Sequence, residues 1–241
     1  MIRKLPFAFI LCSTFLSADD SCTMFQSEAE VGFEQSNFTG SIQAGEEGST
    51  LDMKKDLGIS KSKKGLKAML SRSTTHHKFG FKLEKYEHSG SHKLSQDILF
   101  NGAQYATSTL INSQLSLKWA KLKYRYRFTP AFSVGTDINA LRFKAMVNDN
   151  ETKKTIVLPS LGIEYDKELE EGLRFIAKTS STLTGDSRYL YGYMGVSYDL
   201  KVIDCTSLHM GYQYKKLEIN ADDIHANMEY KGLYAGLAMK F

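Results

Sequence analysis

Two short stretches carry the residue types that hydrolytic enzymes use. Ser207 and His209 stand two residues apart in SLHMGYQY, so on an extended strand both side chains lie on one face. A serine beside a histidine suits nucleophilic attack, because the imidazole can take the hydroxyl proton. Asp223 and His225 have the same spacing near the end of the chain, and a carboxylate can orient a histidine that acts as a base.

Four other histidines could bind a metal: His76, His77, His88 and His92. Their neighbours are mostly Gly, Ser and Thr, and no Cys or carboxylate stands at the spacing of a zinc site. We therefore expect these histidines in solvated turns, with no metal site and no cofactor.

The first residues predict an export signal. Arg3 and Lys4 precede an apolar run of about twelve residues, which is shorter than the roughly twenty that span a bilayer as a helix. We expect residues 1–18 to be a cleaved signal peptide, 19–28 a periplasmic tail and 29–241 a barrel domain. The formal net charge of +4 falls to +2 when these two basic residues leave, so no nucleic-acid partner is expected.

Two of the three cysteines remain after the predicted cleavage. Cys22 lies just before the first predicted strand, and Cys205 lies in a turn expected at the same rim. Export brings an oxidising environment, so a disulfide between Cys22 and Cys205 is feasible if their geometry allows it.

An alternation of apolar and polar side chains recurs from residue 29 to the end of the chain. In FSVGTDI, the apolar residues Phe132, Val134 and Ile138 share a face opposite Gly135 and Asp137. This period of two is typical of β-strands. The polar face is charged in strand after strand, as in a barrel that keeps polar groups in its lumen. The sequence therefore predicts an all-β fold, a transmembrane antiparallel up-and-down β-barrel.

Ten strands are predicted, and eight is the alternative count because the second strand is short. They are expected near residues 29–43, 65–73, 77–89, 110–128, 131–147, 154–167, 172–182, 188–200, 206–218 and 227–241. Connections after the odd-numbered strands tend to be longer and polar, which suits the outer rim of such a barrel. The alternation changes phase between Phe33 and Phe38 and near Trp119, which bulges or strand extensions above the membrane would explain.

A soluble secreted β-sandwich would also alternate. Aromatic residues gather at predicted strand ends, for example Tyr124, Tyr126 and Phe128, as in the aromatic belts at membrane interfaces. A closed barrel also leaves no unpaired edge. These features favour the barrel.

Charged and polar side chains are expected to fill the lumen, because small barrels are packed inside. They are Glu30, Glu34, Lys78, Lys82, Glu84, Arg125, Asp137, Glu164, Arg174, Lys178, His209 and Lys215. Opposite charges must pair or stay hydrated, since a buried lone charge is costly. We interpret the set as a structural network, with a narrow path for ions or small solutes as the alternative.

The order of signal, alternating hairpins and terminal Phe resembles that of small Gram-negative outer-membrane β-barrel proteins. The resemblance implies a C-terminal β-signal at Tyr234, Gly236, Met239 and Phe241, although Met239 departs from the usual aromatic residue. Asp223 and His225 also resemble half of the omptin protease site. The Asp-x-Asp half is absent from the sequence, so proteolysis is not favoured.

The sequence thus predicts a porin-like integral protein of the outer membrane, in the Gram-negative cell envelope, with a structural or surface role and no enzymatic activity. A narrow small-solute or ion channel is the alternative, and an omptin-like protease or lipid A deacylase follows. Expected partners are outer-membrane lipid, lipopolysaccharide and, during insertion, the barrel-assembly machinery. Lysines in the first long loop would meet lipopolysaccharide phosphates: Lys54, Lys55, Lys61, Lys63 and Lys64. Nothing in the sequence indicates the oligomeric state.

Overall fold

A computed structural model describes residues 26–59, 62–182, 185–200, 202–221 and 223–241. The predicted signal peptide and Cys22 lie outside the described residues, as does Lys61. The described residues contain no helix long and apolar enough to cross a membrane.

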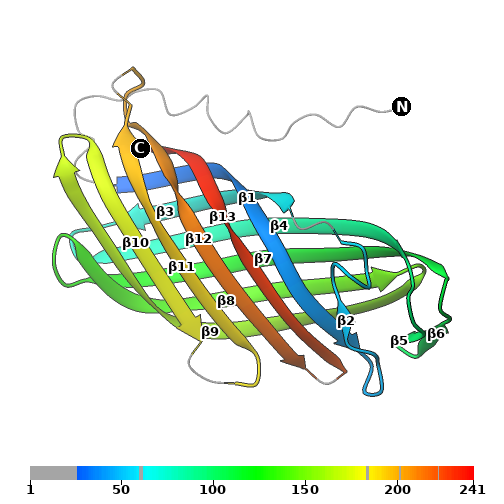
Figure 1. The fold of residues 1–241 in the computed structure, drawn as a ribbon. Coiled ribbons are helices and arrows are strands. Elements are labelled where there is room, and N and C mark those ends of the chain that lie inside the picture. The colour runs from blue at the N-terminus through cyan, green and yellow to red at the C-terminus, as the bar shows by residue number, and fades with distance from the viewer. Residues whose placement is uncertain (1–25, 60–61, 183–184, 201, 222) are drawn as a thin grey trace, which may run out of the picture.

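Ten long strands form a closed antiparallel barrel (Figure 1). Their bounds are β1 Gln26–Ala44, β3 Ser62–Ser73, β4 His77–Lys93, β7 Leu110–Arg127, β8 Phe132–Val147, β9 Asn150–Glu170, β10 Leu173–Thr182, β11 Arg188–Asp199, β12 Thr206–Ala221 and β13 Ile224–Lys240. Neighbours in sequence pair with each other, and β13 pairs with β1 to close the wall. The predicted up-and-down barrel of ten strands is confirmed.

The barrel has two ends of different character. We call the end with the turns at 74–76, 128–131, 171–172 and 200–205 the terminal end, because β1 begins and β13 ends there, and the opposite end the loop end. At the loop end β4, β7, β8 and β9 project beyond the other strands (Figure 1). The connection expected between residues 147 and 154 is shorter than predicted, since only Asn148 and Asp149 separate β8 from β9.

Three short strands occupy the loop end. β2 (Leu51–Asp52) pairs with β1, while β5 (Ile98–Phe100) and β6 (Ala103–Tyr105) form a separate hairpin. Residues 98–105 therefore do not extend any of the long strands. The Tyr105 hydroxyl donates to the Val147 carbonyl at 3.1 Å, and burial together with the nearby Asp149 carboxylate raises the pKa of Tyr105.

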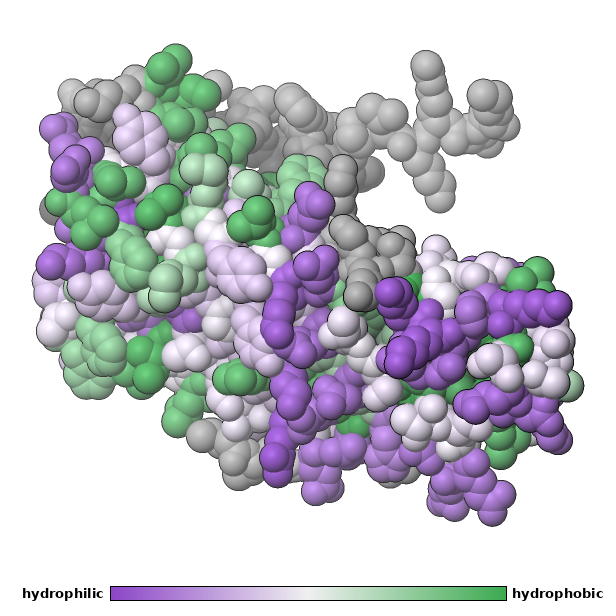
Figure 2. Space-filling view, in the orientation of Figure 1, coloured by the Kyte–Doolittle hydropathy of each residue, from purple (hydrophilic) through white to green (hydrophobic). Residues whose placement is uncertain are grey.

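Halfway along the strands, the apolar side chains change from the outer face of the wall to its inner face. In the terminal half of β7, Leu122 faces outward and is 56% exposed, whereas the inward Lys121 is buried. In the loop half of the same strand, Lys118 faces outward and Leu117 is fully buried inside. Figure 2 shows the outer consequence, with hydrophobic side chains toward the terminal end and hydrophilic ones toward the loop end.

This exchange explains the two phase changes seen in the sequence. Phe33 points outward and is 64% exposed, while Phe38 points inward and is 2% exposed. The pairing of β1 and β7 with their neighbours runs without a register shift, so no bulge is involved. The backbone keeps its period of two, and the residue types change sides.

An apolar core fills the loop half of the barrel. The first long loop contributes to this core, because Leu51, Met53, Leu57 and Ile59 are each at most 3% exposed. An isolated bridge joins Ile59 to Gly90 of β4, and a Cβ at Gly90 would lie 2.3 Å from the Gly58 carbonyl oxygen. The first long loop, which was predicted to be polar and exposed, thus packs into the barrel as a plug. The lumen, which was predicted to be polar throughout, is apolar in the loop half.

Phe143 tests the core of the loop half, because its side chain is fully buried there. We expect Phe143→Ala to lower the free energy of unfolding by about 3–5 kcal/mol. The matched control Arg142→Ala, outward and exposed on the same strand, should change it by less than about 0.5 kcal/mol. Urea unfolding in detergent micelles, followed by the fluorescence of the single tryptophan, Trp119, measures both. Equal effects would contradict the assigned faces.

Candidate functional site in the barrel interior

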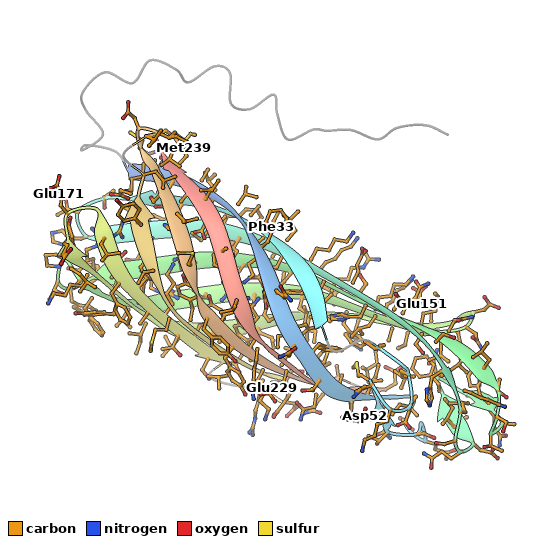
Figure 3. All side chains as sticks on the ribbon, turned by 45° about the horizontal axis from the view of Figure 1, so that its top comes forward. Phe33, Asp52, Glu151, Glu171, Glu229 and Met239 are labelled. Atoms are coloured by element: carbon orange, nitrogen blue, oxygen red, sulfur yellow. The ribbon has the colours of Figure 1, made fainter. Side chains whose placement is uncertain are left out.

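The terminal half of the barrel encloses a network of buried charges. It arises because every strand there turns alternate residues inward, and those residues are mostly charged or aromatic. Outward neighbours in the same half are apolar, as Phe33 and Met239 show in Figure 3, whereas Asp52 and Glu151 mark the loop end. The network is the densest group of polar side chains inside the described chain.

Glu164 on β9 is shared by three lysines. Its Oε1 lies 2.9 Å from the Nζ of Lys78 and 3.7 Å from that of Lys178, and its Oε2 lies 3.0 Å from the Nζ of Lys123. Glu164 is 4% exposed. One carboxylate therefore neutralises only part of the charge that surrounds it.

Asp137 on β8 binds two cations and a hydroxyl. Arg125 donates from Nη1 to Oδ1 at 2.7 Å and from Nη2 to Oδ2 at 3.1 Å, a bidentate geometry that is strong and specific. Ser180 donates to Oδ2 at 2.7 Å, and Lys121 lies 3.4 Å away. These contacts join β7, β8 and β10 along the inner face of the wall.

A third group lies next to the apolar core. Lys215 on β12 contacts Glu34 at 3.4 Å and Glu84 at 2.7 Å. The Tyr86 hydroxyl donates to Glu34 at 2.5 Å, and Lys67 forms an ion pair with Glu34 at 2.8 Å. Lys82 pairs with Glu84 as well. This group links β12, β1, β3 and β4, which belong to one run of five neighbouring strands in the wall.

Glu30 anchors the network near the terminal end. His209 Nδ1 lies 3.3 Å from Glu30 Oε1, and the Tyr234 hydroxyl donates to the same oxygen. A Cβ at Gly236 would lie 2.3 Å from the Tyr234 hydroxyl oxygen, so glycine leaves the space that the phenol occupies. Met239 and Phe241 point outward and are about half exposed (43% and 54%).

Tyrosine rings face several of the lysines. The Nζ of Lys215 lies 4.8 Å from the centre of the Tyr86 ring, that of Lys67 lies 4.6 Å from Tyr234, and that of Lys121 lies 4.9 Å from Tyr189. Such contacts attract cations through the electron density of the ring face. The interior therefore disperses positive charge over rings as well as carboxylates.

Most residues proposed for the lumen meet in this network. Eleven of the twelve lie in it: Glu30, Glu34, Lys78, Lys82, Glu84, Arg125, Asp137, Glu164, Lys178, His209 and Lys215. The twelfth, Arg174, pairs with Asp166 and lines the opening at the terminal end.

Sequence reasoning missed Lys67, Lys121 and Lys123. Lys121 and Lys123 alternate with Ala120, Leu122 and Tyr124 in the sequence. This alternation would have placed both lysines inside the barrel if the apparent change of phase near Trp119 had not been read as a bulge or an extension. Lys67 lies on β3, the strand with the weakest pattern, and only its pairing with β1 and β4 assigns its face.

The residues suggestive of hydrolysis are not arranged as a reactive site. Ser207 and His209 are both buried inside the barrel. His225 points outward, and its Nδ1 lies 3.2 Å from Asn220 Oδ1. The expectation that His88 is solvated is wrong, since it is 2% exposed and stacks on Phe38 with ring centres 4.2 Å apart. Among the described residues, no three His, Cys, Asp or Glu side chains group as metal ligands.

Cys205 stands in the turn between β11 and β12 with a positive φ of 56°. Because Cys22 lies outside the described residues, the disulfide stays a prediction. Lys54 and Lys55 are exposed in the first long loop, and the backbone N–H groups of both donate to Asp52 Oδ1.

Searches against known proteins match the fold alone. No family model matches the chain, and no curated protein matches it by sequence. Among solved structures, the outer-membrane protease OmpT from Escherichia coli has a TM-score of 0.57 at 8% identity, covering 90% of this chain and 97% of OmpT. The attachment invasion locus protein Ail of Yersinia pestis has a TM-score of 0.37 at 11% identity, covering 89% and 99%.

Fold and interior together define the class. The chain has the architecture of small outer-membrane β-barrel proteins, with ten long strands and, in the terminal half, a polar interior inside an apolar outer band. At this level of identity the likeness to OmpT extends to the barrel and not to its chemistry.

Asp137 tests the network, because it accepts from two cations and a serine while 2% exposed. We expect Asp137→Asn to cost about 3–5 kcal/mol of unfolding free energy, since buried cations lose their counter-charge. Glu87→Gln, in the exposed pair with Lys85 on the outer wall, should cost less than about 1 kcal/mol. Urea titration of both variants in micelles measures the difference. A cost for Asp137→Asn no larger than that of the control would contradict the network.

Proposed function

We propose that the protein is an integral barrel of the outer membrane with a closed interior and a structural or surface-exposed role. The observation that carries this proposal is the exchange of apolar faces halfway along the strands. A wall that is apolar outside in one half and polar outside in the other matches two solvents, lipid and water. On this proposal the terminal end faces the periplasm and the loop end stands outside the cell.

The outward apolar side chains support a lipid contact around the terminal half. Nine of the ten long strands in the described chain expose large apolar side chains there, and β10 presents Leu173 and Phe175 outward in partly exposed positions. The exposed residues are Val31, Phe33, Leu66, Leu70, Phe79, Phe81, Leu83, Leu122, Ile138, Val157, Leu161, Ile163, Met194, Met210, Leu233 and Leu237. Tyr126, Phe128, Phe132 and Tyr198 surround the terminal end, where an aromatic belt would meet the headgroups. In water this surface would be a liability.

A row of cations lies directly beyond the apolar band. Lys85 pairs in register with Lys118, and Lys118 pairs with Arg142, so three outward cations stand side by side on β4, β7 and β8. Like charges directly opposite each other destabilise a sheet. Phosphate groups of lipopolysaccharide in the outer leaflet would relieve this repulsion.

The interior favours a closed barrel over a channel. The apolar core and the loop plug fill the loop half, and ion pairs link non-adjacent strands inside the terminal half. Narrow barrels of this size are filled by side chains. The plug and the hairpin of β5 and β6 then form a rigid platform for contacts outside the cell.

Bilayer recording tests the closed interior. We expect purified, refolded protein to insert into a planar lipid bilayer without producing a stable conducting level, because the apolar core excludes hydrated ions. A heat-dependent shift on a denaturing gel serves as the control that the inserted protein is folded. Reproducible unitary steps from the folded protein would favour the channel alternative instead.

Replacing the cation row tests the lipid contact. We expect Lys118→Gln combined with Arg142→Gln to reduce binding of purified lipopolysaccharide by about tenfold or more, since two charge-assisted contacts are lost. Lys167→Gln combined with Arg72→Gln removes the same charge from exposed positions at the terminal end and is the matched control. If both pairs of substitutions reduce binding equally, the row is not the contact.

A further inference from the structure

We propose that the interior of the terminal half binds a small inorganic anion. A cavity of about 70 Å³ lies within the network, several times the roughly 10–15 Å³ that a single water requires. Three carboxylates line it, Glu30, Asp137 and Glu164, against six cationic side chains: Lys67, Lys82, Lys121, Lys123, Arg125 and Lys178.

The imbalance extends to the whole buried network. Adding Lys78 and Lys215 to the cations, and Glu34 and Glu84 to the carboxylates, gives eight against five, an excess of three positive charges. Buried charge without a counter-charge is strongly unfavourable. Tyrosine rings offset part of this cost, but they carry no net negative charge.

Unused hydrogen-bond donors give independent support for an anion. Arg125 Nε and Gln213 Nε2 are buried and have no hydrogen-bond partner in the described part of the chain. Both residues line the cavity and are at most 4% exposed. The Gln213 amide oxygen accepts from Lys67, which assigns the free end of this side chain as the donor. A ligand that only accepts hydrogen bonds, such as a halide or an oxyanion, is of the chemistry that each of these donors lacks.

The cavity has an approach from the terminal end. Glu164 lines both this cavity and a hollow of about 400 Å³ at the terminal opening, whose lining includes Lys78, Arg174 and Lys240. The lining of this hollow holds five basic side chains against four carboxylates, which are Glu164, Asp166, Glu168 and Asp199, so an anion from that side would meet both kinds of charge. The inference is independent of the proposed role, because a sealed barrel and a narrow channel would both contain the same cavity and the same unpaired donors.

Bromide provides a direct test in the unmodified protein. We expect crystals of the full barrel soaked in sodium bromide to show an anomalous peak within the cavity, between Arg125 and Gln213. In micelles at constant ionic strength, replacing sodium gluconate with sodium bromide or phosphate should raise the unfolding midpoint in a saturable way. The stronger of the two responses identifies a halide or an oxyanion as the preferred ligand. An empty cavity in the soaked crystals would overturn the proposal.

Two interior variants and one control sharpen this test. Lys123→Gln should weaken the apparent anion affinity by about tenfold or more, whereas Lys93→Gln on the exposed surface should leave it unchanged. Glu164→Gln removes the carboxylate that three lysines share, so its anion response should exceed that of the unmodified protein. An anion response equal in all three variants would show a general salt effect and refute the site.

Discussion

The ladder of backbone hydrogen bonds around the barrel is the constraint on which the other features depend. Each long strand pairs on both sides in the terminal half, with one register shift between β9 and β10 at Leu173 and Arg174. The pairings from β4 to β9 and from β12 through β13 to β1 continue without interruption into the loop end. Within lipid an unpaired backbone group has no water to bond. The strands must therefore keep one register and one alternation of side chains across two different solvents. Where the surrounding solvent changes along a strand, only the residue types at the outward and inward positions can differ.

This constraint separates the molecule into two interiors. Where the outside is apolar, polar side chains turn inward and must satisfy each other, which they do through the groups around Glu164, Asp137 and Lys215. Where the outside is polar, the interior closes on Phe38, Leu117 and Phe143 as a water-soluble protein would. The first long loop completes that second core, so the loop end is a packed element and not a set of free loops.

The sequence predicted the architecture well because period-two alternation is a local property. The count and order of the long strands and the inward face of eleven lumen residues could be derived from it. It predicted the loop end poorly, because apolar residues such as Leu51 and Met53 acquire an inward position only through contacts distant in the sequence. Lys67 shows the same limit, since its face depends on register with β1 and β4. The surplus of positive charge could be recognised only after the missed lysines had been placed.

A spin-label scan along the outward positions of β7 tests the exchange of solvents most directly. Single cysteines at 126, 124, 122, 120, 118, 116, 114 and 112, with the native cysteines replaced, would carry the label in refolded protein in lipid vesicles. We expect relaxation by oxygen, which dissolves in lipid, to dominate from 124 to 120, and relaxation by a water-soluble nickel complex to dominate from 118 to 112. A uniform response to either reagent along the whole strand would contradict a wall built for two solvents.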